Sequence, residues 1–359
     1  MKVLFIVRST LFTVRGGDTT QVVETARHLQ LLGTEVHICK ASETIDYRPY
    51  DLLHFFNIIR PADMLVHIRR SGKPFVVSTI LVDYSVYDKF HRSGLAGRLF
   101  RLMPAHRIEY AKTLYRATRR QEGVASAEYL WKGHHKSIQS ILRKASMVLV
   151  NTEEEYRRLV TQYQETPPFS IVTNGINKEL FSAHPEVPRE KDLVLCAARI
   201  EGIKNQLQLI HALNKSRFRL LLVGNPAPNQ QSYYQRCRSA AGANIHFIQQ
   251  LSQEELLLYY ARARVHVLPS WFEVCGLSSL EAAAMGCNVV ITKNGYAESY
   301  FNNEAFYCDP ASPDSIRAAV EAAAVSPLSN SLQERIRREY TWEETAGKTQ
   351  FIYRKICGL

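Results

Sequence analysis

Residues 265–292 read VHVLPSWFEVCGLSSLEAAAMGCNVVIT. The β-branched run 265–268 enters a Pro-Ser loop, an alanine-rich stretch of helical composition follows, a glycine ends it, and a second β-branched run starts at Asn288. This order is half of a β-α-β unit and predicts a parallel sheet. Glu273 falls in the loop and Glu281 in the helix, so we expect both carboxylates near the carboxyl end of a strand, where open α/β sheets bind ligands.

A glycine pair follows the first apolar run of the chain. Residues 3–7 form that run, the loop after it contains Gly16 and Gly17, and a helical pattern begins directly afterwards. Paired glycines let the backbone approach a ligand closely, and the free N–H groups at the start of a helix favour an anion. Gly-Gly also marks ordinary turns, so the pair alone does not indicate a ligand-binding loop. Its position after the first strand is the more informative feature.

Two further blocks lie in the middle of the chain. Residues 171–177 read IVTNGIN and contain Asn174, and residues 194–205 read VLCAARIEGIKN. In the second block a strand delivers Arg199, and Lys204 comes directly before a helical pattern at 207–213. Two cations at one strand end can bind an anionic group, and the alternative is a pair of solvated surface charges.

Taken in this order, the blocks resemble the retaining glycosyltransferases of family 4. The spacing of Glu273 and Glu281 is similar to the E-x7-E signature of that family, and 174–181 is similar to its Asn-Gly-Val-Asp-x-x-x-Phe segment. The resemblance implies the GT-B fold, in which two Rossmann-like, doubly wound α/β domains enclose a cleft and a C-terminal helix crosses back. It also implies transfer of a sugar from a nucleotide diphosphate sugar to a saccharide or lipid-linked saccharide acceptor, in cell-surface polysaccharide or glycolipid synthesis.

The resemblance assigns a role to each block. Arg199 and Lys204 would stabilise the leaving diphosphate without a metal or a cofactor, and Glu273 would hold the donor sugar, so these three are the expected catalytic residues. A retaining, front-face displacement is expected, in which the leaving phosphate takes the proton of the acceptor. Glu281 would accept the ribose hydroxyls. The residues expected to bind the donor are Gly16, Gly17, Asn174, Gln250, Gly276, Leu277, Ser278 and Glu281.

The acceptor side departs from the family pattern. Many members carry a His-Asp pair after the fourth strand, whereas here Asp83 has no histidine before it. The segment 51–56 resembles the family's earlier Asp-x-x-His and contributes His54. We expect Asp83 and His54 to position the acceptor, and the alternative for His54 is a packed strand-end residue, because a lone histidine beside an apolar run is usually packed.

Length and composition predict two domains. The 359 residues exceed one typical domain, and the polar, proline-containing run 182–191 is typical of a linker. We expect an acceptor-binding domain over 1–180, joined by 342–359, which resembles the helix that crosses back. We expect a nucleotide-sugar-binding domain over 181–341.

The cysteines and the apolar runs predict the compartment. The seven cysteines are odd in number and scattered, which is typical of reduced thiols in a cytoplasm. The apolar runs fall short of the ~20 residues that span a membrane. Met1 and Lys2 lead directly into a strand, which is not typical of a signal peptide. We therefore expect a cytoplasmic protein.

Positive charge is concentrated between residues 86 and 146. This stretch holds thirteen Lys and Arg and four Asp and Glu, which is nine of the eleven net positive charges of the chain. Its leucines recur at helical spacing, a pattern typical of a membrane-surface helix. We expect peripheral contact with the inner face of the cytoplasmic membrane. The alternatives are a groove for an anionic acceptor and a solvated helical face, and no nucleic-acid motif accompanies the charge.

Two other functions fit part of the pattern. A GT-B sugar-nucleotide enzyme that is not a transferase, such as an epimerase, shares the architecture. An inactive sugar-nucleotide-binding partner would keep the second domain while the first has drifted. A NAD-linked dehydrogenase does not fit, because the Gly16-Gly17 pair is not followed by the Gly-x-x-Gly spacing of that class.

Overall fold

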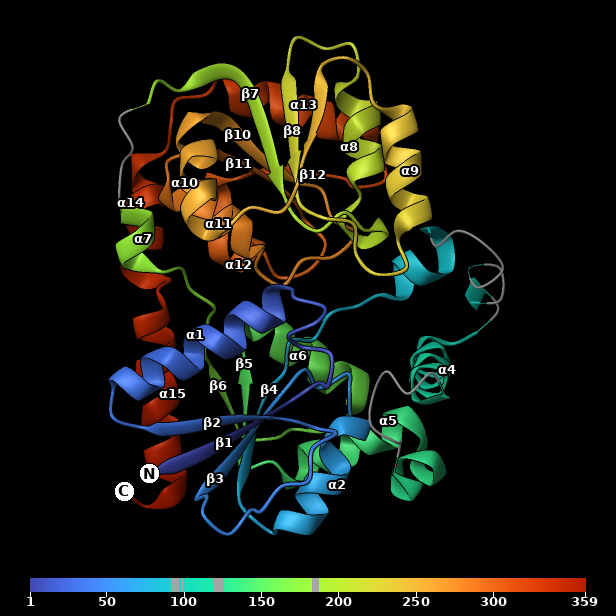
Figure 1. Cartoon of the computed structure of the whole chain (residues 1–359), viewed down its shortest axis with the longest axis vertical. Helices are drawn as coiled ribbons and strands as arrows, with labels where there is room; N and C mark the ends of the chain where they lie inside the picture. The colour runs from blue at the N-terminus through green and yellow to red at the C-terminus, as the bar shows by residue number, and fades with distance from the viewer. Residues whose placement is uncertain (92–96, 98–99, 102, 119–125, 183–186) are drawn as a thin grey trace. The chain divides into compact units, whose positions relative to one another are not determined.

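The computed structural model describes residues 1–91, 97, 100–101, 103–118, 126–182 and 187–359 (Figure 1). The chain divides into two compact units. The first unit comprises Met1–Leu81, Arg98–Asn174 and Trp342–Leu359, and the second unit comprises Val82–Gly97 and Gly175–Thr341. The division expected from the sequence placed 82–97 and 175–180 in the first domain, whereas the structure groups both segments with the second unit.

Tyr87 explains why its segment groups with the second unit. A β-carbon at Gly202 would lie 1.9 Å from the Tyr87 hydroxyl oxygen. The ring of Tyr87 therefore occupies the space that a side chain at position 202 would need. This contact joins two segments that are far apart in the sequence, so the apolar periodicity of either one does not reveal it.

The first unit is built on a parallel six-stranded sheet in the order β2-β1-β3-β4-β5-β6 (Figure 1). Parallel strands are covered on both faces, so they form continuous apolar runs, and all five residues of β3 are buried. The strands are β1 (Lys2–Val7), β2 (Glu35–Lys40), β3 (Leu52–Phe56), β4 (Phe75–Ser78), β5 (Met147–Val150) and β6 (Phe169–Ile171).

Helices cover both faces of this sheet, as right-handed crossovers require. Helix α1 packs against α15, while α2 and α6 both pack against α5 (Figure 1). Thr152 begins α6 by accepting a hydrogen bond from the Glu155 N–H. The helices are α1 (Gly17–Leu31), α2 (Ala62–Ser71), α4 (Ala105–Thr118), α5 (Ala127–Lys144), α6 (Glu153–Tyr163) and α15 (Trp342–Cys357).

The second unit has its own parallel six-stranded sheet, in the order β12-β11-β10-β7-β8-β9. Its largest apolar cluster lies around the central strands β7 and β10. The strands are β7 (Glu190–Ala197), β8 (Arg219–Val223), β9 (Ile245–Ile248), β10 (Ala263–Leu268), β11 (Asn288–Thr292) and β12 (Phe306–Cys308). The α/β class and the doubly wound architecture of both halves are therefore confirmed.

The helices of the second unit begin at recognisable caps. Ser252 and Glu255 form a capping box at the start of α10, and Ser312 caps α13, whose first residue is Pro313. The helices are α7 (Lys178–Ser182), α8 (Gln206–Leu213), α9 (Gln231–Ala240), α10 (Gln253–Arg262), α11 (Leu277–Ala284), α12 (Glu298–Phe301), α13 (Pro313–Val325) and α14 (Asn330–Glu339).

Candidate active site

The strand order of the second sheet reverses between β7 and β10, which are neighbours although β8 and β9 separate them in the chain. Open α/β sheets bind ligands at such a reversal, outside the carboxyl ends of the strands. The segment after β7 carries Arg199 and Lys204, and the segment after β10 carries Glu273. All three residues expected to be catalytic therefore lie beyond the carboxyl ends of these two strands.

Lys204 and Glu273 are in direct contact. The Lys204 Nζ donates a hydrogen bond of 2.5 Å to Glu273 Oε1, and the Ser270 hydroxyl donates one of 2.5 Å to the same oxygen. None of the described residues donates a hydrogen bond to Glu273 Oε2. The carboxylate is thus held through one oxygen, and its second oxygen remains available to a ligand hydroxyl.

The environment of Lys204 favours its charged form. Burial is the largest single effect and lowers the pKa of the ammonium, but the charge and hydrogen bond of Glu273, together with the charge of Glu201, raise it, so the net shift is upward. Arg199 is also paired, because its Nη2 donates to Glu201 Oε1 at 2.8 Å. The site therefore contains two cations, each fixed by a carboxylate.

Backbone hydrogen bonds hold the segments after β7 and β10 together. The Trp271 N–H donates to the Ile203 carbonyl at 2.9 Å. Asn205 has a left-handed conformation with φ +59°, and its side-chain amide donates to the Pro269 carbonyl at 3.0 Å. These contacts lie on either side of Lys204 and fix the segment that presents it to Glu273.

The backbone of Glu273 is anchored to the segment after β11. Its N–H donates to the Asn294 carbonyl at 3.0 Å, and its carbonyl accepts from the Tyr296 N–H at 2.9 Å. Gly295 lies between these partners with φ +120°, and a β-carbon there would lie 1.9 Å from the Glu273 carbonyl oxygen. Glycine is therefore required at position 295 for this contact.

Glu281 lies in α11, as the sequence predicts, and is 8% exposed. Its Oε2 accepts a 2.9 Å hydrogen bond from the Tyr260 hydroxyl, and its Oε1 accepts one of 2.8 Å from the Gln253 amide. Burial raises the pKa of the carboxyl to about 7, although both hydrogen bonds lower it. Each oxygen can accept one more hydrogen bond, so a ligand hydroxyl can join these donors.

The start of α11 supplies a further feature of a binding site. Gly276 precedes the helix with φ +67°, a conformation that favours glycine. Leu277 and Ser278 form the first turn, in which backbone N–H groups have no carbonyl partner within the helix and carry partial positive charge. These are the groups that the sequence predicts to face the donor.

Gln250 lies two residues after the end of β9 and is exposed. Its N–H donates to the Asn225 side-chain oxygen at 3.2 Å. Because Asn225 follows β8, this contact joins the segments beyond two neighbouring strand ends of the same sheet. The expected donor-binding role of Gln250 stays a prediction.

Three expected donor-binding residues lie in the first unit. Gly16 precedes α1 in an extended conformation, and its N–H donates to the Thr19 hydroxyl at 3.1 Å, while Gly17 is exposed as the first residue of the helix. Beside them, Asp18 forms an ion pair with Arg8 at 2.6 Å. Asn174 is the last residue of the segment Arg98–Asn174 of the first unit, and it is buried.

His54 is enclosed in the first unit. Its Nδ1 lies 2.5 Å from the Tyr353 hydroxyl, its Nε2 lies 2.8 Å from the Ser78 hydroxyl, and its ring stacks on Phe56. Burial lowers its pKa to about 3, so the ring is neutral at physiological pH. These contacts favour the packed alternative over direct contact with an acceptor.

Asp83 is partly buried, and its Oδ1 accepts a 2.7 Å hydrogen bond from the Ser85 N–H. Its segment groups with the second unit, together with Arg199, Lys204 and Glu273. The expected role of Asp83 in positioning the acceptor stays a prediction.

Sequence reasoning missed four polar residues that support this site. Ser270 had a local signal, because it stands three residues before Glu273 in the Pro-Ser loop. Tyr260 and Gln253 had none, since they reach Glu281 from another helix. His266 in β10 is fully buried, its Nδ1 lies 3.2 Å from the Ser279 hydroxyl, and its Nε2 has no hydrogen-bond partner among the described residues.

Part of the basic stretch 86–146 is described, and it exposes apolar side chains. Trp131 in α5 is 87% exposed, Leu130 is 48% exposed, and Tyr115 in the neighbouring α4 is 59% exposed. Arg101 and Arg107 are exposed on the same unit. Of the other arginines in the expected basic helices, Arg92, Arg98, Arg119 and Arg120 lie outside the described residues.

The residues that the structure describes contain no cluster of three His, Cys, Asp or Glu side chains placed to bind a metal ion. None of the helices described here has the length and apolar content needed to cross a bilayer.

Residues 177–340 match the family model described as glycosyl transferases group 1, and this range contains all of the site residues on the strand ends of the second sheet. A D-inositol 3-phosphate glycosyltransferase from a Nocardioides species is 25% identical over 60% of this chain and 55% of its own length. The match thus spans little more than half of that relative.

Solved structures share the fold over the whole chain. Sucrose-phosphate synthase from Thermosynechococcus elongatus superposes with a TM-score of 0.76 at 17% identity and covers 100% of both chains. HepE from Anabaena, solved in complex with UDP and glucose, gives a TM-score of 0.67 at 15% identity, with 99% of this chain and 100% of that chain covered. The chain therefore has the GT-B fold, and its residues 177–340 are similar to the group 1 glycosyl transferases.

Proposed function

We propose that this protein is a retaining glycosyltransferase of family 4. It moves a sugar from a nucleotide diphosphate sugar to a saccharide or lipid-linked saccharide acceptor, in cell-surface polysaccharide or glycolipid synthesis. The contact between Lys204 and Glu273 carries this proposal. It joins a cation suited to a phosphate and a carboxylate suited to sugar hydroxyls, at the strand reversal where such sheets bind ligands.

Lys204 and Arg199 stabilise the leaving diphosphate. As the anomeric bond breaks, negative charge grows on the β-phosphate, and fixed cations stabilise that charge without having to reorganise. An ammonium has three N–H donors, and the bond to Glu273 uses one of them. Lys204 can therefore contact Glu273 and a phosphate oxygen together. The first N–H groups of α11, at Leu277 and Ser278, supply further donors for the diphosphate.

The two glutamates bind different parts of the donor. Glu273 accepts hydrogen bonds from the sugar hydroxyls through Oε2, while Ser270 and Lys204 hold Oε1. Glu281 accepts from the ribose hydroxyls in addition to Tyr260 and Gln253. In the retaining reaction the leaving phosphate takes the proton of the acceptor on the same face. Because Arg199 and Lys204 neutralise that phosphate, no metal ion is needed for this step.

Nucleotide binding tests whether the protein has the proposed donor site. HepE, which shares the fold, was solved with UDP, so UDP is the first nucleotide to compare with GDP and ADP in a thermal unfolding assay. A ligand at 100 times its dissociation constant stabilises the folded protein by roughly 2.7 kcal/mol. A shift with one of the three nucleotides is expected, and no shift with any of them would contradict the donor site.

Consumption of the donor tests whether the protein transfers the sugar to an acceptor. A transferase releases free sugar slowly from the donor without an acceptor and forms a glycoside when an acceptor is added. An epimerase-like enzyme converts the donor without an acceptor, and an inactive binding partner does neither. Incubation of the matching UDP, GDP or ADP sugar with and without a candidate acceptor therefore separates the three functions.

We also propose that the basic surface within 86–146 contacts an anionic membrane. The exposed Trp131 and Leu130 support this, since amphipathic aromatic side chains favour the membrane interface and basic residues are attracted to anionic lipid. All seven cysteines are free thiols, which supports a cytoplasmic location at the inner face of the membrane.

A further inference from the structure

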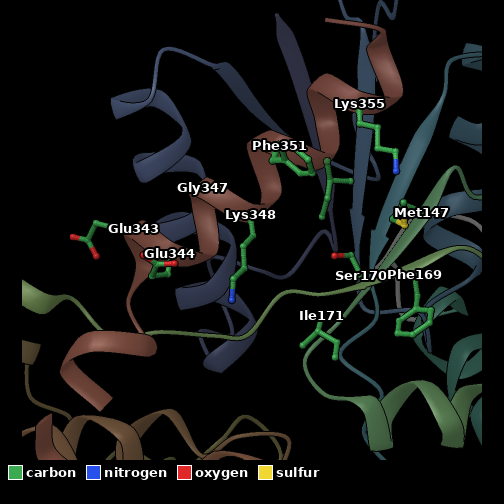
Figure 2. A pocket seen from close by; sticks show the side chains of 11 residues that line it. Met147, Phe169, Ser170, Ile171, Glu343, Glu344, Gly347, Lys348, Phe351 and Lys355 are labelled. Carbon is green, nitrogen blue, oxygen red and sulfur yellow. The ribbon is translucent and has the colours of Figure 1, made fainter. Parts of the chain in front are cut away.

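The edge strand β6 of the first unit borders a groove of about 610 Å³ (Figure 2). β6 is the last strand in the sheet order, and β5 is its one strand neighbour among the described residues. Figure 2 shows Phe169, Ser170 and Ile171 on the strand side of the groove and the α15 residues Lys348, Phe351 and Lys355 on the other side. An unpaired strand edge beside exposed apolar side chains is a template for pairing with another chain.

The backbone of β6 presents its outward groups in a defined register. The Val148 N–H donates to the Pro168 carbonyl, and the Val172 N–H donates to the Val150 carbonyl, each at 2.8 Å. The even-numbered residues of this segment therefore point their backbone groups at β5. Because successive residues alternate along a strand, Phe169 and Ile171 point theirs at the open edge.

The side chains on this edge are apolar and exposed. Phe169 and Ile171 are each 40% exposed, and Phe351 on α15 is 71% exposed. Phe169 stacks on Tyr156 with ring centroids 3.7 Å apart, which fixes its ring. The groove therefore offers an ordered apolar surface next to unpaired backbone groups.

Charges are arranged along α15 with opposite signs at its two ends. The Thr345 hydroxyl donates to the Thr173 carbonyl at 2.7 Å, so the start of α15 lies near the carboxyl end of β6. Glu343 and Glu344 line the groove at that end, and Lys355 lines it together with Met147 (Figure 2). The helix thus runs antiparallel to β6, with acidic residues near Ile171 and a lysine towards Phe169.

We propose that this groove pairs with the same groove of a second copy of the chain, with a two-fold axis at Ser170 and perpendicular to the sheet. Such an axis makes the two β6 strands antiparallel and places Phe169 opposite Ile171 of the second copy. Their outward backbone groups then form the hydrogen-bonded pairs of an antiparallel ladder. The two sheets join into one sheet of twelve strands.

The same axis makes the charges complementary. It places the two α15 helices side by side and antiparallel on one face of the joined sheet. Lys355 of each copy then lies next to Glu343 and Glu344 of the other, because each lysine is at the Phe169 end and each glutamate pair is at the Ile171 end. A surface that is complementary to itself in shape and charge is the requirement for a two-fold interface, which is why a second copy is the occupant.

A cysteine at the axis tests the register. Ser170 faces its own copy as a non-hydrogen-bonded pair with a Cα separation of about 4.5 Å, which lies in the range that a disulfide spans. Mild oxidation of Ser170→Cys should give a covalent dimer linked through position 170, as peptide mass mapping would show. Ser71→Cys is the matched control, since Ser71 is also partly exposed on the first unit, and neither this variant nor the oxidised wild type with its native cysteines should form a covalent dimer. Failure of Ser170→Cys to cross-link faster than Ser71→Cys would overturn the proposal.

A charge exchange tests the pairing of the helices. Lys355→Glu should raise the dimer dissociation constant about tenfold, because two exposed ion pairs are lost by symmetry, and adding Glu344→Lys to this variant should restore dimerisation. Arg354→Glu is the control, since Arg354 is exposed on α15 but does not line the groove. Sedimentation velocity over a wide concentration range measures all four proteins. An equal effect of Arg354→Glu, or no rescue by the exchange, would contradict this pairing.

A proline at the open edge tests the strand pairing itself. Ile171→Pro removes an N–H that points away from β5, so the unit should remain folded while the ladder to the second copy is lost. Ile171→Val should keep the dimer. A wild-type chain that is monomeric at every concentration, or a dimer unchanged by Ile171→Pro in a variant with unaltered circular dichroism, would overturn the proposal. A dimer with a different register would leave Ser170→Cys uncross-linked and would equally contradict it.

Discussion

Lys204 donates a 2.5 Å hydrogen bond to Glu273 Oε1 and thereby joins the segments beyond two adjacent strands, β7 and β10. The Glu273 carboxylate keeps the ammonium charged against the effect of burial, as the raised pKa of Lys204 indicates. The cation proposed to stabilise the leaving phosphate is therefore held in position by a carboxylate, and a fixed charge lowers the reorganisation needed during the reaction.

Replacing Lys204 with alanine should lower kcat by on the order of a hundredfold or more, because one fixed charge at the leaving phosphate is lost. Arg199→Ala should have an effect of the same kind. Initial rates at saturating donor would measure both. Lys204→Arg is the control that keeps the charge but changes its geometry, and it should retain more activity than Lys204→Ala. Full activity in both alanine variants would remove these residues from the leaving-group role.

Glu273→Ala should reduce turnover more than affinity for the free nucleotide, since the proposed partner of Glu273 is the sugar. Calorimetric titration with the nucleotide diphosphate and steady-state kinetics with the sugar donor would separate the two effects. Ser270→Ala is the matched control, because it removes one of the two hydrogen bonds to Glu273 Oε1 and keeps the carboxylate. Ser270→Ala should therefore lose less turnover than Glu273→Ala. Equal losses of nucleotide affinity and turnover in Glu273→Ala would contradict the sugar assignment.

The architecture around 265–292 was predictable because each step has a local cause. The β-branched run forms β10, the alanine-rich stretch forms α11, and the run from Asn288 forms β11. The sequence also placed Glu281 in the helix and Glu273 in the preceding loop, where the structure has them. Strand and helix periodicities are local properties, so they remain readable without tertiary information.

The partners of those carboxylates were not predictable from the same patterns. Lys204 and Glu273 are 69 residues apart, and Tyr260 reaches Glu281 from another helix. Such contacts depend on strand order and on side-chain direction, neither of which is encoded in spacing. The grouping of 82–97 with the second unit has the same origin, since it depends on the contact of Tyr87 with Gly202.

Glu281 should make the free energy of unfolding fall as pH rises from about 4.5 to about 7. Burial raises the pKa of the folded carboxyl to about 7 from the ordinary value of 4.5, so in this window the folded state holds a proton that the unfolded state has lost. The full effect is about 3 kcal/mol. Glu281→Gln lacks this titration, so in urea unfolding its free energy of unfolding should increase relative to that of wild type as the pH rises from 5 to 8. A difference in the free energy of unfolding between the two proteins that is the same at pH 5 and at pH 8 would contradict the buried, protonated state.

His54 should have the opposite pH dependence. Burial lowers its folded pKa to about 3 from the ordinary value of 6.5, so below pH 6.5 the unfolded state binds a proton that the folded state does not. Its contribution to the free energy of unfolding is complete above pH 6.5 and is lost by about 1.4 kcal/mol per pH unit below it. His54→Gln should flatten this slope in urea unfolding at pH 5 to 7.

The same variant distinguishes the two interpretations of His54. If the ring is a packed residue, His54→Gln should keep KM for the acceptor close to that of wild type once the protein is folded. If the ring positions the acceptor, KM for the acceptor should rise while nucleotide affinity is unchanged.

Trp131 should report on membrane contact. Of the three tryptophans, Trp271 and Trp342 are buried and Trp131 is 87% exposed, so a blue shift of the emission on mixing with vesicles would come from Trp131. The shift is expected with vesicles that contain anionic lipid and should weaken with neutral lipid or rising salt, because exposed charges are screened over ~8 Å at physiological ionic strength. Trp131→Ser should reduce co-sedimentation with anionic vesicles.

The basic residues of the same surface allow a second test of membrane contact. Arg101→Glu combined with Arg107→Glu should abolish co-sedimentation, since each basic residue near an anionic surface contributes about 1 kcal/mol and reversal replaces attraction with repulsion. Hydrolysis of the donor without an acceptor should be nearly unchanged in this variant, because the proposed Lys204, Glu273 and Glu281 contacts belong to the second unit. Equal binding to neutral and anionic vesicles, or binding to neither, would reject the membrane surface and favour a groove for an anionic acceptor.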